Sequence, residues 1–86
     1  MNIGLDYDGT VTADRAFWLA FYYMARACGH TVYIVTMRHD TEPVTDFPAM
    51  VYYTGRKAKK PWCDANGIPI DWWIDDQPNW LVYDSA

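Results

Sequence analysis

Residues 3–12 constrain the fold of this chain more than any other stretch. A short apolar run ends there in two aspartates one residue apart, Asp6 and Asp8, followed by Gly9 and Thr10. Alternate side chains of a strand point to the same side, so the two carboxylates would share one face if the strand continued. Gly9 indicates a turn instead, because glycine adopts backbone angles that other residues resist. The stretch therefore predicts a buried strand whose carboxyl end carries two acids.

A strand end of this kind has a specific chemical use. Two converging carboxylates supply the oxygen ligands that Mg²⁺ prefers, and exposed loop N–H groups can bind a phosphate. In open α/β sheets, ligands bind in the crevice outside the carboxyl ends of the strands. The plain alternative is a polar turn after an edge strand, because Asp and Gly are common in turns. The rest of the chain decides between the two.

Strand patterns alternate with helical patterns along the whole chain. We expect strands at residues 2–6, 31–35, 49–53 and 70–74, and helices at residues 13–28 and 61–66. A last apolar piece, residues 80–83, is either a helical turn or a fifth strand. This alternation predicts βαβ units and hence a single α/β domain, residues 1–86, with a parallel sheet of four or five strands.

The first helix has the clearest boundary signals. Thr12 is expected as its N-cap and Gly29 as its stop, and Pro61 is expected in the first turn of the second helix. The core face of the first helix is expected at residues that recur every three or four positions: Phe17, Phe21, Met24 and Cys28, with Trp18 and Tyr22 beside them. The aromatic residues of this helix are thus interpreted as core residues.

Composition narrows the class of protein. Half of the 86 residues are apolar (51%), enough for one small packed core. A net charge of −4 leaves no broad basic face, which argues against tight binding to a nucleic-acid duplex. Cys28 and Cys63 are expected to be reduced thiols in or near the core. There is no basic segment before the first apolar run and no apolar stretch long enough for a bilayer, so no membrane partner and a cytoplasmic location are expected.

Further polar residues follow the later strands. Thr36 and Arg38 come after the second strand, and Asp75 and Asp76 come after the fourth; a basic run, residues 56–60, precedes the second helix. Parallel strands point their carboxyl ends to one edge of the sheet, so these side chains are expected to converge there. Acids, a hydroxyl and a cation at one place favour a site for a phosphate and a metal over a simple turn.

Segments of this chain resemble, in order, the four motifs of the haloacid dehalogenase (HAD) superfamily of phosphohydrolases. They are Asp6-x-Asp8-Gly9-Thr10 after a strand, Thr36 after a second strand, a lysine before a helix, and Asp75-Asp76 after a later strand. The resemblance covers nearly the whole chain. It implies a HAD-like Rossmannoid fold, a three-layer α/β/α sandwich, and a Mg²⁺-dependent phosphatase.

The resemblance also implies roles for individual residues. Asp6 would be the nucleophile that forms an aspartyl-phosphate, and also a Mg²⁺ ligand. Asp8 would be the general acid/base, with its backbone carbonyl on the metal. Thr36 would form a hydrogen bond with the transferring phosphoryl group. Asp75 and Asp76 would hold Mg²⁺ directly or through water.

Three basic or hydroxyl positions are less closely specified. The catalytic lysine is assigned to Lys59, with Lys60 kept second as a substrate-binding residue and Lys57 as a third option. Thr10 would support the loop and is assigned to substrate binding. Arg38 would clamp the substrate phosphate, because residues 36–38 also resemble a phosphate-binding segment of phage polynucleotide kinase-phosphatases. The plain alternative for Arg38 is a surface salt bridge, to Asp40 or Glu42.

The chain departs from many members of that family in its size. The first motif runs straight into a helix, and only a short loop separates the third strand from the second helix, so no cap domain is expected. An open site suits a large substrate, such as a nucleic-acid end or a phosphoprotein, or a homo-oligomer whose second subunit covers the site. A nucleotide or another phosphomonoester is also considered as the substrate. An exposed Trp72, Trp73 or Trp80 could stack a base, but these residues could equally be core or a dimer face. Trp72 and Trp73, adjacent on a strand, must point to opposite faces.

Two other functions are compatible with parts of this pattern. A non-catalytic phosphate-binding or regulatory module would keep the fold without turnover, although every catalytic position is filled here. A phosphoacceptor receiver domain also places acids, a hydroxyl and a lysine around Mg²⁺. In receiver domains, however, the acid pair comes first and the lysine last, whereas here the lysine precedes the final acid pair.

Overall fold

The computed structural model describes residues 1–86 as a parallel sheet flanked by helices. The strands are β1 (Asn2–Leu5), β2 (Thr31–Thr36), β3 (Met50–Tyr53) and β4 (Trp72–Ile74), and the α-helices are α1 (Arg15–Ala27) and α2 (Lys59–Ala65). All neighbouring strands pair in parallel, in the order β3-β2-β1-β4. The predicted α/β architecture with a parallel sheet is confirmed. Residues 80–83 do not form a fifth strand: a short 3₁₀ helix, Pro78–Leu81, lies there instead.

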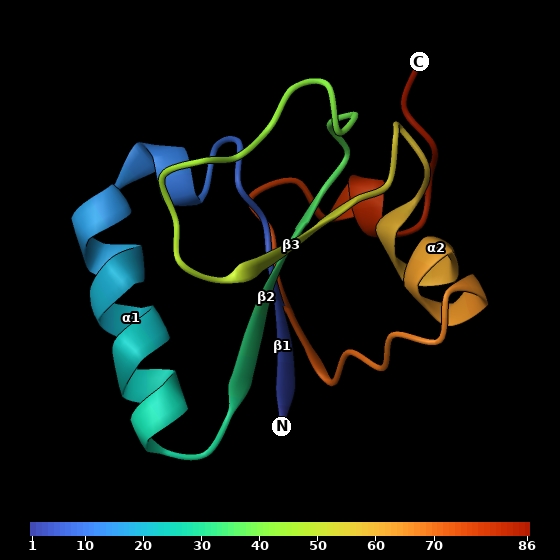
Figure 1. The fold of residues 1–86 in the computed structure, drawn as a ribbon. Helices are drawn as coiled ribbons and strands as arrows, with labels where there is room; N and C mark the ends of the chain where they lie inside the picture. The colour runs from blue at the N-terminus through green and yellow to red at the C-terminus, as the bar shows by residue number, and fades with distance from the viewer.

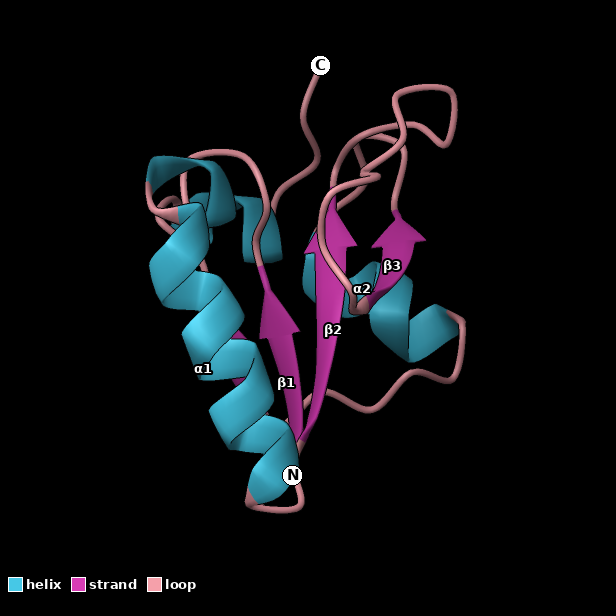
Figure 2. Cartoon of the chain, turned by 60° about the vertical axis from the view of Figure 1, so that its left-hand side comes forward, coloured by secondary structure: helices cyan, strands magenta, loops and turns pink.

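The two α-helices lie on opposite faces of the sheet, and the loops that follow the strands gather at one edge (Figure 1, Figure 2). On the α1 side, Ile3 and Leu5 of β1 pack with Val32 and Ile34 of β2 in one buried cluster. On the other side, a Cβ on Gly4 would come within 2.8 Å of the Trp73 ring, so Trp73 packs directly on the β1 backbone. Apolar residues on both faces are typical of a fully covered parallel sheet.

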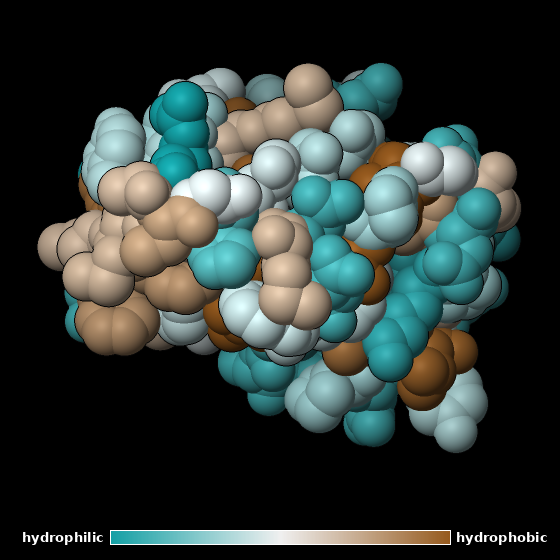
Figure 3. Space-filling model, turned by 90° about the horizontal axis from the view of Figure 1, so that it is seen from below, coloured by the Kyte–Doolittle hydropathy of each residue, from teal (hydrophilic) through white to brown (hydrophobic).

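The predicted core face of α1 is only partly right: Tyr22 is in the core and Trp18 and Phe21 pack against it, as predicted, but the other three predicted residues are not buried. Phe17 and Met24 are 57% and 70% exposed, and Cys28 is exposed, whereas Tyr22 and Ala25 are buried against the sheet. Charge is confined in this helix to Arg15 and Arg26, so apolar residues surround almost the whole axis and their spacing does not single out one face. The surface on the side of α1 is accordingly tan to brown in Figure 3.

Both helices also begin at residues other than those predicted. The N-cap of α1 is Asp14, whose carboxylate accepts a hydrogen bond from the Phe17 N–H at 3.2 Å. Thr12 instead accepts from the Gly9 N–H at 2.9 Å and closes the preceding turn. The helix α2 begins at Lys59, two residues before Pro61, which is tolerated because first-turn N–H groups have no partner within a helix.

Smaller features agree more closely with the sequence. Gly29, just past the end of α1, has a φ of +87°, as expected for a helix stop. Cys63 is buried, as predicted, and neither cysteine is bonded to the other. Strand boundaries differ from prediction by one or two residues, β4 being the shortest because it starts at Trp72. Neither helix has the length and apolarity that a bilayer-spanning segment requires.

Candidate functional site

A cleft of about 240 Å³ lies at the carboxyl ends of the strands. It brings together seven of the residues that the sequence singled out: Asp6, Asp8, Thr36, Arg38, Lys59, Asp75 and Asp76. They come from the ends of β1, β2 and β4 and from the start of α2. The convergence follows from parallel pairing, since every strand delivers its following residues to the same edge.

Three of these carboxylates form the acidic centre of the cleft. One oxygen from each of Asp6, Asp75 and Asp76 lies within 4.8 Å of the other two. Thr10 lies behind them: its hydroxyl is 3.0 Å from Asp6 Oδ2 and 3.4 Å from Asp76 Oδ1, and it accepts from the Asp76 N–H at 3.2 Å. Thr10 does not line the cleft, and its contacts hold the carboxylates in place. It was predicted to bind substrate as well as to support the loop.

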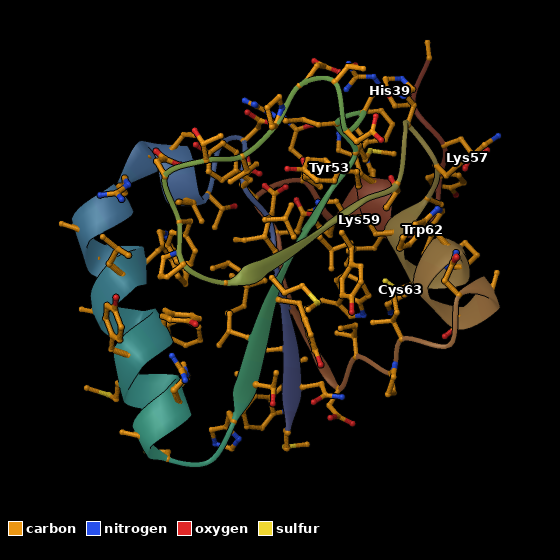
Figure 4. All side chains as sticks on the ribbon, viewed as in Figure 1. His39, Tyr53, Lys57, Lys59, Trp62 and Cys63 are labelled. Carbon is orange, nitrogen blue, oxygen red and sulfur yellow. The ribbon has the colours of Figure 1, made fainter.

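Lys59 is the lysine of the site. Its ammonium lies 2.7 Å from Asp6 Oδ1 and 2.6 Å from Asp75 Oδ2, and the residue is 2% exposed. Figure 4 shows Lys59 pointing inward from the start of α2, whereas Lys57 points away from the molecule. Lys60 lines a separate shallow pocket, because consecutive residues of a helix point about 100° apart. The structure thus brings Lys59, and neither Lys57 nor Lys60, to the acids.

Asp6 is held in an unusual electrostatic position. Burial, together with its neighbours Asp76 and Asp75, raises the pKa of Asp6 to about 7, although the Lys59 ammonium acts in the opposite direction. Desolvation disfavours the charged form of a carboxyl group, and nearby acids add to that effect. In the absence of a metal ion, the carboxyl group of Asp6 therefore titrates near neutral pH.

Asp8 belongs to a second, more exposed pair. Arg38 Nε and Nη2 donate to the two Asp8 oxygens at 2.9 and 2.8 Å, and the guanidinium lies over the Tyr7 ring at 5.0 Å from its centroid. These hydrogen bonds lower the pKa of Asp8. The side chain of Arg38 does not pair with that of Asp40 or Glu42; it takes only the Glu42 backbone carbonyl, at 3.3 Å.

Thr36 ends β2 on the wall of the cleft. The residue is 1% exposed, and its hydroxyl accepts from the Arg38 N–H at 3.3 Å. That hydrogen bond leaves the Thr36 O–H free to donate to a group in the cleft.

The tryptophans divide as the strand geometry requires. Trp73 packs on Gly4, and Trp72 points the other way, with its ring 5.4 Å from that of His30. Neither lines the cleft. Trp80 does, together with four residues that were not predicted, Met37, Arg56, Gln77 and Ser85. Proximity to Asp76 along the chain was the available signal for Gln77; nothing in the sequence pointed to Ser85.

Gly9 is required by the geometry of this site. Its φ is +86°, and a Cβ there would lie 2.3 Å from Asp76 Oδ2. We expect Gly9→Ala to destabilise the protein by about 2–3 kcal/mol, through left-handed strain plus displacement of the carboxylate. Urea unfolding measures the change.

Gly29→Ala is the matched control for this substitution. Gly29 has nearly the same φ, +87°, but a Cβ there would meet no atom within 4 Å. It should cost only the backbone strain, about 1 kcal/mol. Equal losses in the two variants would contradict a close approach of Gly9 to Asp76.

The donor set of the cleft fits a hard divalent cation. Asp6, Asp75 and Asp76 offer oxygen ligands from two strand ends, which is the chemistry that Mg²⁺ prefers. The lining carries four carboxylates, counting Asp8, against three cations, Arg38, Arg56 and Lys59. A divalent cation would reverse this excess of negative charge and allow a phosphate to enter.

No family model, curated protein or solved structure matches this chain, so its function is inferred from its own residues and their geometry.

Proposed function

We propose that this protein is a Mg²⁺-dependent phosphatase of the HAD type that hydrolyses a phosphomonoester through Asp6. The observation that carries the proposal is the convergence of Asp6 with Lys59, Asp75 and Asp76 in a cleft that Thr36 also lines. These residues are 16 to 70 positions apart along the chain, except for the adjacent pair Asp75 and Asp76, so only the fold assembles them. The arrangement matches the roles that the resemblance implies.

The chemistry follows from the side chains. A carboxylate oxygen of Asp6 attacks phosphorus, the bond from phosphorus to the leaving oxygen breaks, and Asp8 gives that oxygen a proton. Water then attacks the aspartyl-phosphate, Asp8 takes its proton, and the phosphate leaves with Asp6 restored. Lys59 and Thr36 donate hydrogen bonds to the Asp6 carboxylate and the phosphoryl oxygens.

A cation held by Asp6, Asp75 and Asp76, with the Asp8 carbonyl, would neutralise phosphate charge as the attack proceeds. Arg38 has a second task in this scheme. Arg38 lowers the pKa of Asp8 and so keeps it deprotonated, the form that accepts a proton from water. If Arg38 turned to the phosphate, the pKa of Asp8 would rise and Asp8 could carry the proton that the leaving oxygen takes.

Substrate size follows from the surroundings of the cleft. The chain passes from β1 to α1 and from β3 to α2 without an inserted domain, so no such domain covers the cleft. We propose a nucleotide or a nucleic-acid end as the substrate, with Trp80 at the cleft available to contact a base. The proposal includes a homo-oligomer in which a second copy of this chain covers the open cleft.

The pKa of Asp6 predicts how cation binding depends on pH. Cation binding requires the deprotonated carboxylate, and the Asp6 pKa is about 7. We expect Mg²⁺ affinity to rise by up to about tenfold per pH unit below pH 7 and to level off above it. Calorimetric titration between pH 5.5 and 8.5 measures this. An affinity that does not change between pH 5.5 and 7 would contradict the assignment of Asp6 as a ligand.

Hydrolysis of p-nitrophenyl phosphate tests the proposed reaction. Purified protein is assayed for phosphate release with Mg²⁺ and with excess chelator, then with 3′- and 5′-phosphorylated oligonucleotides. Release that requires Mg²⁺ supports the proposal.

A non-catalytic phosphate-binding module is the second candidate. The observation that favours it is the bidentate Arg38 pair, which occupies the proposed general acid. Folded, Mg²⁺-saturated protein that binds phosphate but turns over no phosphomonoester would support this candidate.

A further inference from the structure

Arg56 has a backbone conformation that sets it apart from every other residue except glycines. Its φ is +71°, the only positive value at a non-glycine position in residues 1–86. Its N–H donates to the Met37 carbonyl at 2.8 Å, and its own carbonyl accepts from the Ser85 N–H at 2.7 Å. The chain therefore fixes Arg56 between the loop after β2 and the C-terminal segment, in a conformation that non-glycine residues rarely adopt.

The side chain of Arg56 lines the same cleft as the acids. It lies toward the mouth, because it is 40% exposed, whereas the side chains of Lys59 and Asp6 are 3% and 9% exposed. The reacting phosphate belongs with the buried groups. Arg56 is thus placed where the leaving group of a bound phosphomonoester would lie.

Arg56 is also the cation of the lining that is least committed to the site's own carboxylates. Lys59 is buried between two acids, and Arg38 holds Asp8 with two hydrogen bonds. The side chain of Arg56 makes a single hydrogen bond, 3.3 Å to Glu42, and both side chains are more than one-third exposed. An exposed pair with one contact contributes little, so an incoming anion can displace Glu42 at small cost.

The neighbours of Arg56 fit a leaving group that combines an anion with an apolar body. The two apolar residues of the lining are Met37 and Trp80, and Met37 is bonded to Arg56 through the backbone. The cleft is smaller than most small-molecule sites, so a substrate extends past its mouth and meets these rim residues.

We propose that Arg56 binds a second anionic group, a phosphate or a carboxylate, on the leaving-group side of the phosphomonoester. The inference rests on the proposed phosphatase function and names a feature of its substrate. Selectivity then arises because the guanidinium can donate charge-assisted hydrogen bonds to either anion.

Three synthetic substrates test this assignment: phenyl phosphate, 4-carboxyphenyl phosphate and 4-phosphonophenyl phosphate. The last two add a carboxylate or a phosphonate to the leaving group and so distinguish the two anions. The measured quantity is the kcat/KM of each charged substrate relative to phenyl phosphate, compared between variants so that intrinsic reactivity cancels. We expect this ratio to fall about tenfold in Arg56→Gln for at least one anion, the factor produced by about 1.4 kcal/mol.

Three further variants control for net charge, for the guanidinium group and for the competing acid. Lys57→Gln removes the same charge from the next residue, whose side chain is 66% exposed and does not line the cleft, and should keep the ratio. Arg56→Lys should retain part of it. Glu42→Gln should raise it, because the competitor for Arg56 loses its charge.

The outcomes separate this inference from the function on which it rests. Phenyl phosphate hydrolysis with the same ratio in wild type and Arg56→Gln overturns the role of Arg56 and leaves the phosphatase standing. An equal fall in Lys57→Gln also overturns it, because net charge alone then explains the effect. Hydrolysis of none of the three substrates by folded, Mg²⁺-loaded protein overturns both.

Discussion

Replacement of Asp6 by Asn is expected to lower kcat for p-nitrophenyl phosphate by at least about 10⁴-fold, as loss of a covalent nucleophile does in other enzymes. The carboxamide has the shape of the carboxylate but a much weaker nucleophile. The variant should still fold. Asp6 is only 8% exposed, so a charged carboxylate there is costly to bury, and a neutral side chain removes that cost. Lys59 keeps its partner Asp75 at 2.6 Å. Initial rates and urea unfolding on the same preparation separate the two effects.

Asp64→Asn provides the matched control for Asp6→Asn. Asp64 is exposed on α2 and does not line the cleft, yet its replacement removes the same charge. This variant should keep wild-type kcat. Activity in Asp6→Asn within tenfold of wild type would exclude Asp6 as the nucleophile.

Replacement of Lys59 by Met should have the largest effect on stability. The ammonium is buried between Asp6 and Asp75, and its removal leaves those acids with no cation in contact. Breaking a buried ion pair from one side costs about 3–5 kcal/mol. We expect a loss of that size in the free energy of unfolding without Mg²⁺, and a fall in kcat of about 10²–10³-fold.

Mg²⁺ should partly restore the stability of Lys59→Met, because a bound cation replaces the missing positive charge among the carboxylates. The gain on adding Mg²⁺ should exceed that of wild type. Lys60→Met is the neighbouring control: Lys60 is exposed and lies outside the cleft, so its loss should change stability by less than about 0.5 kcal/mol. A similar loss in both variants would contradict the buried role of Lys59.

The sequence was a good guide to the sheet and to the acids of the cleft. Apolar runs at β1, β2, β3 and β4 indicate buried strands, and Asp6 and Asp75 follow two of them directly. Parallel pairing then requires their side chains to meet at one edge. The positive φ of Gly9 was likewise predictable, because a glycine directly after a strand indicates a turn with backbone angles that other residues resist.

The sequence was a poor guide wherever several residues of one kind compete for one position. Apolar residues surround nearly all of α1, so spacing could not tell that Ala25 is buried and Met24 exposed. Lys59 was preferred to its basic neighbours Lys57 and Lys60 only through the family resemblance, and the structure brings Lys59 to the acids. Phe17 and Cys28 fit the expected period as well as the residues that the sheet covers.

The sequence by itself determined the order of strands and helices along the chain, the parallel pairing of the strands, and which acids lie at the carboxyl edge of the sheet. These features depend on local patterns repeated along the chain. Only the tertiary structure decided that Lys59 enters the cleft, that Arg38 pairs with Asp8, and that Arg56 stands at the mouth. The physical reason is that a side chain's partner depends on the rotation of its helix or loop against distant segments. Packing fixes that rotation, and no local pattern encodes it.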